Sequence, residues 1–193
     1  MFVIESDFDY KGYRCVTIFG DMGWRCGYVG VPEGNSLYGK EYTDYVDIGM
    51  DELNDEPIGK RGIIPVFLSA WDDSDNVRMD LYFNVHGGLT FSGDEHPIEC
   101  GLWWLGFDCG HYGDGKDLDK VEELWGDNKR IKVRLEIERR YPSDEPVRSL
   151  EYVQQECRNL VDQIIEYDVV REDKSCYSEF YCEGRDCGEC ACE

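Results

Sequence analysis

Two of the three histidines lie in glycine-rich segments, and each segment follows an apolar stretch. His86 begins the segment HGGLTFSGD, and His111 lies within GFDCGHYGDG. Glycine lets the backbone approach a ligand closely or adopt a positive φ, so loops of this kind often form the floor of a pocket. If the two segments follow neighbouring strands, we expect both imidazoles to face one concave site.

The residues around these histidines are of types that bind ligands. Asp108, His111 and Asp114 have the spacing D-x2-H-x2-D. With His86 they form a set that suits a divalent metal ion, or acid–base chemistry in which a carboxylate orients an imidazole. These four are the candidate metal ligands. The full predicted ligand site is His86, Gly87, Gly88, Trp104, Asp108, His111 and Asp114.

Other interpretations of the same loops remain open. Their amide N–H groups could hold an anion such as a nucleotide phosphate, although the chain has no Walker or dinucleotide fingerprint. Cys109 could act as a nucleophile if His111 deprotonates it, but no oxyanion donor can be assigned. A structural role is the plain alternative, because histidines after strands often serve as hydrogen-bonded scaffolding. His96, beside Pro97 in an acidic turn, is expected to face solvent.

Aromatic and basic residues complete the candidate site. Trp103 and Trp104 are adjacent, so on a strand they point to opposite faces. We expect one in the core, while the other walls a pocket or stacks on a base. An anionic ligand would also need local cations, and the candidates are Arg25, Lys40, Arg61 and Arg78.

The ten cysteines are expected to be reduced thiols, because the acidic N-terminal segment lacks the basic region of a signal peptide. Five of them crowd into the C-terminal segment with the spacing C-x5-C-x4-C-x2-C-x-C. That pattern contains one C-x2-C pair, whereas a structural zinc site usually needs two. We expect a flexible reduced tail, and zinc or another soft metal is the alternative.

Period-two patterns predict several strands. Residues 1–31 indicate two or three strands rich in β-branched and aromatic residues. Residues 78–85 alternate apolar and polar side chains, and 101–108 form an apolar stretch bounded by glycines. Residues 130–138 alternate most sharply, which predicts a strand with one exposed face. Residues 63–70 are compatible with a further buried strand.

Two helices follow from capping and periodicity. Asp117 can cap a short helix with an apolar face, and Ser149 can cap a longer helix that extends to about Ile165. The glycine- and proline-containing segment 32–60 predicts a long surface connection with one helical turn near residues 50–53.

Strands grouped early and helices grouped late predict an α+β fold. We expect an antiparallel or mixed sheet with the long C-terminal helix packed on one face. The composition changes after Asp168 to acidic and cysteine-rich. This change divides the chain into a globular domain, 1–167, and a tail, 168–193.

Composition limits the function classes. The chain has 193 residues, with 20 Lys and Arg against 42 Asp and Glu, and a formal net charge of -22. Such a charge repels phosphate backbones and anionic lipids, so we expect neither direct nucleic-acid binding nor membrane binding. No apolar run approaches the ~20 residues that span a bilayer. The expectation is a cytoplasmic protein.

Four ordered blocks between residues 10 and 165 form a recognisable pattern. They are RCGYVGVPEGNSLYGKEY (25–42), VHGGLTFSGD (85–94), WWLGFDCGHYGD (103–114) and SLEYVQQECRNLVDQI (149–164). This pattern resembles a family of small uncharacterised proteins encoded by bacteriophages and prophages. The cysteine-rich tail and segment 116–140 depart from it. The resemblance implies a phage accessory protein acting in the cytoplasm of a bacterial host, a class that often counters host defence.

Three functions compete at this point. The first is a pocket that sequesters or hydrolyses a small anionic ligand of the nucleotide class. The second is an acidic inhibitor that imitates the charge of DNA on a host defence protein or other nucleic-acid-binding protein. The third is a virion component. The sequence does not decide between enzyme and binding protein, and it leaves the oligomeric state open.

Overall fold

The structure is a computed structural model that describes residues 1–49 and 76–180. Several sequence predictions lie outside these residues. They are the helical turn near residues 50–53, the strand at 63–70, Arg61, and the cysteines from Cys182 onward.

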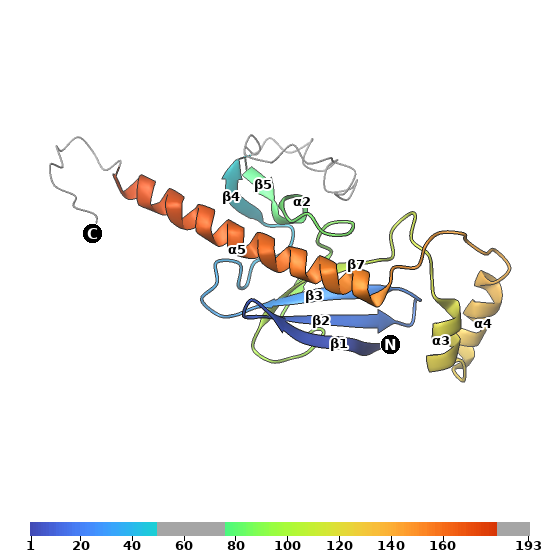
Figure 1. The fold of residues 1–193 in the computed structure, drawn as a ribbon. Helices are drawn as coiled ribbons and strands as arrows, with labels where there is room; N and C mark the ends of the chain where they lie inside the picture. The colour runs from blue at the N-terminus through green and yellow to red at the C-terminus, as the bar shows by residue number, and fades with distance from the viewer. Residues whose placement is uncertain (50–75, 181–193) are drawn as a thin grey trace.

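An antiparallel sheet of five strands forms the body of the protein (Figure 1). Its spatial order is β1-β2-β3-β7-β6, with all neighbours antiparallel. The strands are β1 (Phe2–Tyr10), β2 (Tyr13–Gly20), β3 (Arg25–Val31), β6 (Phe91–Gly93) and β7 (Trp103–Asp108). The pairing of β3 with β7 joins two segments far apart in the sequence, and it brings the end of β7 beside the start of β3.

The two faces of this sheet bury separate hydrophobic clusters. Val29 and Leu105 are register partners on the face that also buries Cys15 and Phe107. Trp104 lies on the other face, with Tyr28, Val16 and Ile18. Trp103 packs against the first cluster instead. The prediction that the two adjacent tryptophans point to opposite faces is therefore confirmed.

The long helix α5 (Leu150–Phe180) covers the first face of the sheet (Figure 1). Ser149 accepts a hydrogen bond from the Tyr152 backbone N–H, so it caps the helix as predicted. The helix lies very close to β3, because a Cβ on Gly27 would lie 2.8 Å from the Cys157 sulfur. It continues to Phe180, past the expected domain boundary at Asp168.

A second, two-stranded sheet lies over the same hydrophobic cluster. It pairs β4 (Tyr45–Gly49) with β5 (Asn76–Arg78), and β5 leads directly into the short helix α2 (Met79–Tyr82). The strand predicted at 78–85 is therefore wrong beyond Arg78, although its apolar residues are buried as expected. The Phe83 N–H bonds to the Met79 carbonyl, which closes a helical turn where the pattern predicted an extended chain.

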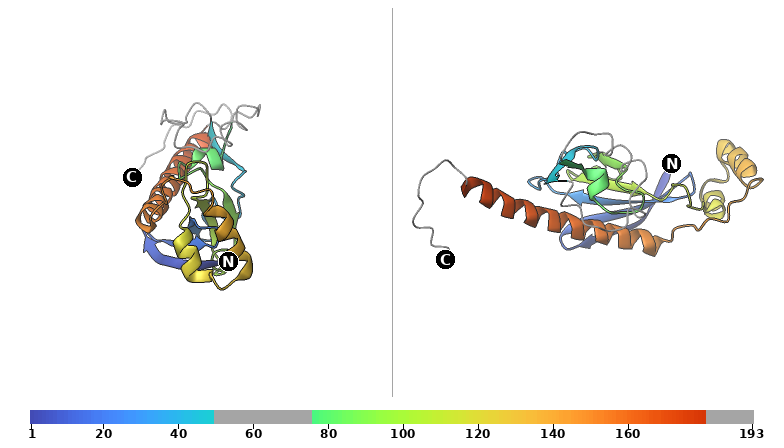
Figure 2. Two further views of the ribbon diagram at one scale, coloured as in Figure 1. Left: turned by 90° about the vertical axis from the view of Figure 1, so that its right-hand side faces the viewer. Right: turned by 90° about the horizontal axis from the view of Figure 1, so that it is seen from above.

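The helices α3 (Leu118–Trp125) and α4 (Lys129–Glu138) form a hairpin at one end of the sheet (Figures 1 and 2). Asp117 caps α3 through the Lys120 N–H, which confirms the predicted cap. The strand predicted at 130–138 is wrong, because these residues form α4. Asn128 accepts hydrogen bonds from the Arg130 and Ile131 N–H groups, a helix cap that the alternating pattern did not reveal.

The alternation in α4 gives two apolar edges instead of one strand face. Residues four apart share a helix face, and residues two apart lie on nearly opposite faces. Ile131 and Leu135 are buried against Phe19 and Val121 in a third cluster. Val133 and Ile137 remain 56% and 53% exposed.

Together these elements confirm the α+β fold class, with a C-terminal helix packed on an antiparallel sheet. None of the described helices is both long enough and apolar enough to cross a membrane.

A matched pair of substitutions tests the helical assignment of α4. Leu135→Ala should lower the free energy of unfolding by about 2–4 kcal/mol, because it removes buried apolar contacts. Val133→Ala should change it by less than about 0.5 kcal/mol. Urea denaturation measures both values. Equal losses at the two positions would indicate the strand instead, in which both residues share one buried face.

Candidate functional site

The two histidine loops converge, as the sequence predicted. The ring centroids of His86 and His111 lie 5.7 Å apart. A Cβ built on Gly87 would lie 2.0 Å from the His111 Nε2 atom, and the φ of Gly87 is +71°. Glycine is therefore required at position 87, because the backbone of one loop packs directly against the imidazole of the other.

Main-chain hydrogen bonds fix the loop that carries His111. The Cys109 N–H donates to the Arg25 carbonyl, which extends the β3–β7 pairing by one bond beyond Asp108. Further along, the Asp114 N–H donates to the His111 carbonyl, and the Asp117 N–H donates to the Gly23 carbonyl. The loop is thus bonded at its start, its centre and its end.

Asp114 is the centre of the site. Its Oδ2 atom accepts hydrogen bonds from His86 Nε2 at 2.8 Å and from the His111 backbone N–H at 3.0 Å. Its Oδ1 atom accepts from Arg148 Nε at 2.8 Å. Only 2% of its side chain is exposed. One carboxylate therefore joins three segments: the loop after α2, the loop after β7 and the segment that leads into α5.

These partners decide the charge of Asp114. Burial raises the pKa of its carboxyl group, but the hydrogen bonds from His86 and Arg148 outweigh burial and hold the pKa below its usual value. The group is therefore an ionised carboxylate at neutral pH, and it can only accept hydrogen bonds.

The ionised carboxylate sets the hydrogen bonding of His86. Because Asp114 only accepts, the His86 Nε2 atom carries the proton between them. In neutral His86 the Nδ1 atom is then an acceptor, and it lies 2.9 Å from the Tyr152 hydroxyl. A phenol, an imidazole and a carboxylate form one line of hydrogen bonds. This order suits proton transfer between Tyr152 and His86, with Asp114 orienting the ring.

Tyr152 itself is not preactivated. Burial, with a contribution from Glu156, raises the pKa of its phenol above the ordinary value. It is therefore a neutral hydroxyl that donates to His86 at neutral pH, and it would lose its proton only as a reaction proceeds.

Arg148 and His111 present the more accessible groups of the site. The Arg148 side chain is 31% exposed, and beyond its Nε bond to Asp114 its terminal amino groups form no ion pair with the described residues. His111 is about as exposed, with its Nε2 atom 3.8 Å from Asp108 Oδ1. That nitrogen is buried and has no hydrogen-bond partner in the described part of the chain. We call His86, His111, Asp114, Arg148 and Tyr152 the His–Arg site.

Sequence reasoning missed Arg148 and Tyr152. Their four-residue spacing gives no distinct signal, because Arg148 lies before α5 and its sequence position is that of an ordinary surface arginine. It also missed Trp24, whose indole packs against Gly110, where a Cβ would lie 2.5 Å from the ring. Lys116 Nζ lies 5.7 Å from the centre of the same ring.

One predicted site residue lies elsewhere. The structure brings together five of the predicted site residues, which are His86, Gly87, Asp108, His111 and Asp114, and Gly88 follows in the same loop as Gly87. Trp104 is fully buried in the cluster on the opposite face of the sheet, where its indole N–H donates to the Ile98 carbonyl. It belongs to the core and contributes nothing to the His–Arg site.

His96 is also not where the sequence placed it. It is only partly exposed, and its Nε2 atom lies 3.0 Å from the Tyr28 hydroxyl. Its ring packs edge-on against Tyr28, Phe91 and Phe2. Burial lowers the pKa of this imidazole. The expectation of a solvent-facing residue was wrong because three aromatic rings enclose the turn.

Two candidate cations are used inside the fold. Arg25 pairs with Glu5 at 2.7 Å, and both side chains are buried. Arg78 pairs with Asp80 at 2.7 Å. The donors expected for an anionic ligand are therefore not these two residues.

The metal and nucleophile interpretations find no support. Within residues 1–49 and 76–180, no group of three or more His, Cys, Asp or Glu side chains is placed to hold a metal ion. Both ring nitrogens of His86 are already hydrogen-bonded. Cys109 is buried, and burial together with the Asp114 carboxylate raises the pKa of its thiol. A neutral buried thiol is a poor nucleophile.

Comparison with protein-family models, curated proteins and solved structures finds no match for the chain.

The packing of Gly87 against His111 gives a prediction with a matched control. Gly87→Ala should destabilise the fold by roughly 1–3 kcal/mol more than Gly113→Ala, because only the first Cβ meets a neighbouring ring. Both glycines have positive φ, and a Cβ on Gly113 would meet nothing within 4 Å. Urea denaturation gives the difference, and imidazole NMR signals of His111 should move only in Gly87→Ala. Equal effects would show that the loops do not pack as described.

The lowered pKa of Asp114 predicts a pH dependence of stability. A carboxyl group with a depressed pKa stabilises the folded state above its unfolded value of 3.8, and this contribution is lost as pH falls through the folded-state pKa. Asp114→Asn should therefore cost about 1–3 kcal/mol at neutral pH. The difference from the unmodified chain should shrink below pH ~4. A difference that is constant with pH would contradict this assignment.

Proposed function

We propose that the chain is a bacteriophage accessory protein that binds a small anionic ligand of the nucleotide class at the His–Arg site. In this proposal it acts in the host cytoplasm and removes the ligand by sequestering or hydrolysing it. The observation that carries the proposal is the environment of Arg148. Its Nε atom is held by a buried carboxylate, and its outer amino groups have no protein partner among the described residues.

A guanidinium held in this way is preorganised for an oxyanion. Arginine presents a planar fork of donors that matches phosphate and carboxylate groups. Its stem is fixed by Asp114, and its charged carbon lies 5.3 Å from the centre of the Tyr152 ring. Little side-chain entropy therefore remains to be lost on binding.

The imidazole and indole groups nearby supply the remaining contacts of a nucleotide. His111 is partly exposed beside the His86 ring, and because its Nε2 atom is buried, its Nδ1 atom is the one that could donate to a phosphate oxygen. Trp24 is partly exposed beside the same loop, and indole faces stack well on nucleobases. The lysine over that ring, Lys116, is a second nearby cation, 37% exposed and paired with Glu138 at 3.2 Å.

The net charge of the chain does not prevent such binding. At an ionic strength of about 0.15 M the Debye length is about 8 Å, so distant carboxylates are largely screened. The nearby Asp114 charge is already compensated by Arg148. The acidic surface slows the approach of an anion, and local donors decide the affinity.

Hydrolysis would use the Tyr152–His86–Asp114 line. In that case the Tyr152 oxygen attacks the phosphorus while His86 accepts the phenol proton, and Asp114 stabilises the charged imidazole. The P–O bond to the leaving group breaks and that group takes the proton from His86. Water then cleaves the phosphotyrosyl bond, which regenerates the phenol and releases the phosphate product. Sequestration needs only the donors of Arg148 and His111. Chromatography of the ligand after incubation with the protein distinguishes the two outcomes.

Binding of defined nucleotides tests the proposal. Native mass spectrometry of the protein from its producing cell is the first step, because it shows a retained ligand directly. Calorimetry with nucleoside mono- and triphosphates and with cyclic dinucleotides follows. Arg148→Gln should weaken affinity at least about tenfold, because a charge-assisted hydrogen bond contributes about 1.5–3 kcal/mol. His111→Ala should also weaken it.

The control is Arg139→Gln, which removes an arginine that is also ion-paired but lies at the C-cap of α4. It should bind as the unmodified chain does. If no nucleotide binds, or if Arg148→Gln binds as tightly as the control, the proposal fails.

A further inference from the structure

The outer face of α4 is apolar at its centre and basic at its rim. Val133 and Ile137 lie one helical turn apart and are more than half exposed. Three cations are near them in the chain: Lys129 and Arg130 in the first turn of α4, and Arg140 two residues past its end. All three are exposed, and none forms an ion pair with another described residue. In a chain with a formal charge of -22, three such cations near two exposed aliphatic side chains form a distinct surface, which we call the α4 ridge.

Most other described cations are neutralised within the fold. Arg14, Arg25 and Arg78 pair with Asp7, Glu5 and Asp80. The pairing extends to the same hairpin, where Arg139, the C-cap residue of α4, bridges to Asp119 and Glu122 on α3. The cations of the α4 ridge, in contrast, have no ion-pair partner in the hairpin, and the nearest acid on their side is the exposed Glu136, one turn from Val133 and Arg140.

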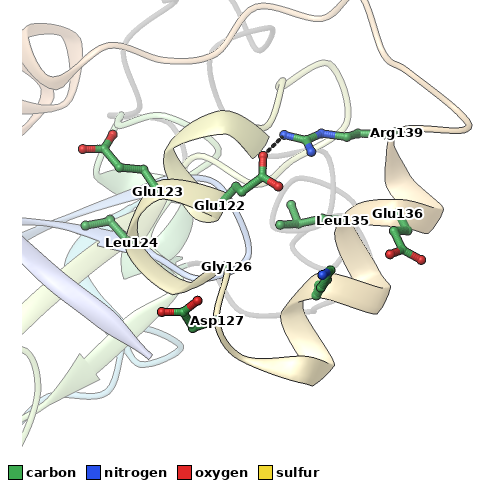
Figure 3. A pocket seen from close by; sticks show the side chains of 9 residues that line it. Glu122, Glu123, Leu124, Gly126, Asp127, Leu135, Glu136 and Arg139 are labelled. Atoms are coloured by element: carbon green, nitrogen blue, oxygen red, sulfur yellow. Dashed lines mark hydrogen bonds and ion pairs between the residues drawn. The ribbon is translucent and has the colours of Figure 1, made fainter.

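Beside the ridge is a groove of opposite charge. It lies between α3 and α4, has a volume of about 400 Å³, and is shown in Figure 3. Leu124 and Leu135 are among its lining residues, and its charged lining residues are Glu122, Glu123, Asp127, Glu136, Lys132 and Arg139. In Figure 3 the Glu123 and Leu124 side chains point away from α4. Glu122 pairs with Arg139, whereas the other three acids and Lys132 form no ion pair with the described residues. We call this the α3–α4 groove.

The ridge and the groove are complementary in charge and in apolar character. Each includes aliphatic side chains. The unpaired charges of the ridge are positive, while the groove has three unpaired acids against one unpaired cation, Lys132, and so has an excess of negative charge. One hairpin carries both surfaces. Because every copy of the chain carries both surfaces, a two-fold axis can place the ridge of each copy on the groove of the other.

We infer that the α3–α4 hairpin is a dimerisation element and that its occupant is the hairpin of a second copy of this chain. The ridge of one copy places Val133 and Ile137 on the groove of its partner, and its cations face the partner's unpaired acids. The hairpin lies at the end of the sheet opposite the C-terminal end of α5, with the start of β1 beside it (Figures 1 and 2). This inference is independent of the proposed ligand.

The size of the surface sets the expected strength. The ten residues of α4 span about 15 Å, so the hairpin offers a few hundred Å² per partner. That is the small end of specific interfaces, which predicts a reversible dimer. At about 0.15 M salt the repulsion between the two net charges is screened beyond about 8 Å, while contact pairs at the rims are retained.

A charge-swap experiment with the full-length chain tests the inference. The first variant combines Glu123→Lys with Asp127→Lys and makes the groove basic. The second combines Lys129→Glu with Arg140→Glu and makes the ridge acidic. Each variant alone opposes like charges and should dimerise at least about tenfold more weakly in sedimentation velocity. A mixture of the two restores both contacts and should form a heterodimer.

Two further variants separate this outcome from general effects. Lys11→Glu with Lys40→Glu changes the net charge as the second variant does, but away from the hairpin, and should dimerise normally. Val133→Asn with Ile137→Asn should abolish the dimer, with unchanged circular dichroism because both positions are exposed. The inference is overturned if the unmodified chain is monomeric at all concentrations, or if the mixture stays monomeric. It is also overturned if the ridge cations instead bind anionic vesicles or DNA while the chain stays monomeric.

Discussion

The buried carboxylate of Asp114 is the interaction on which the site depends. A carboxylate so little exposed is stable only when donors surround it. Its three donors come from His86, Arg148 and the His111 backbone. These segments are far apart in the sequence, so the electrostatic requirement of one side chain holds together two loops and the start of α5. The strand pairing of β3 with β7 brings the loop into range, and the carboxylate then fixes its partners.

The same interaction orders the chemistry of the site. Because Asp114 stays ionised, it fixes which nitrogen of His86 carries the proton and leaves the other nitrogen for Tyr152. It also holds the stem of Arg148 while the outer guanidinium stays accessible. A residue that no ligand needs to touch therefore positions those that a ligand would touch. Many binding and catalytic sites hold their ligand-contacting side chains in place with supporting residues of this kind.

The sequence predicted the convergence of the two loops but not the residues that complete it. Glycines around His86 and His111 leave a local signal, because close packing and positive φ exclude other side chains. Arg148 leaves none, because an arginine before a helix cap looks like any surface residue until the helix is docked. Trp104 shows the converse error. An aromatic residue in a strand carries no mark of which sheet face will be the core.

The hairpin shows why periodicity alone could not decide its structure. In residues 130–138 every second residue is apolar. A strand would bury all of these apolar residues on one face, whereas a helix buries only half of them. The Asn128 cap and the cluster with Phe19 select the helix, which leaves Val133 and Ile137 exposed. Exposed aliphatic side chains oppose solubility unless something covers them or surrounding charge keeps them apart. Here the nearest unpaired cations are Lys129, Arg130 and Arg140 on an acidic protein, so their charge is complementary to the acidic surface of a second copy. For this reason we infer that the exposed Val133 and Ile137 side chains belong to a contact surface and are not merely left over from the alternating sequence pattern.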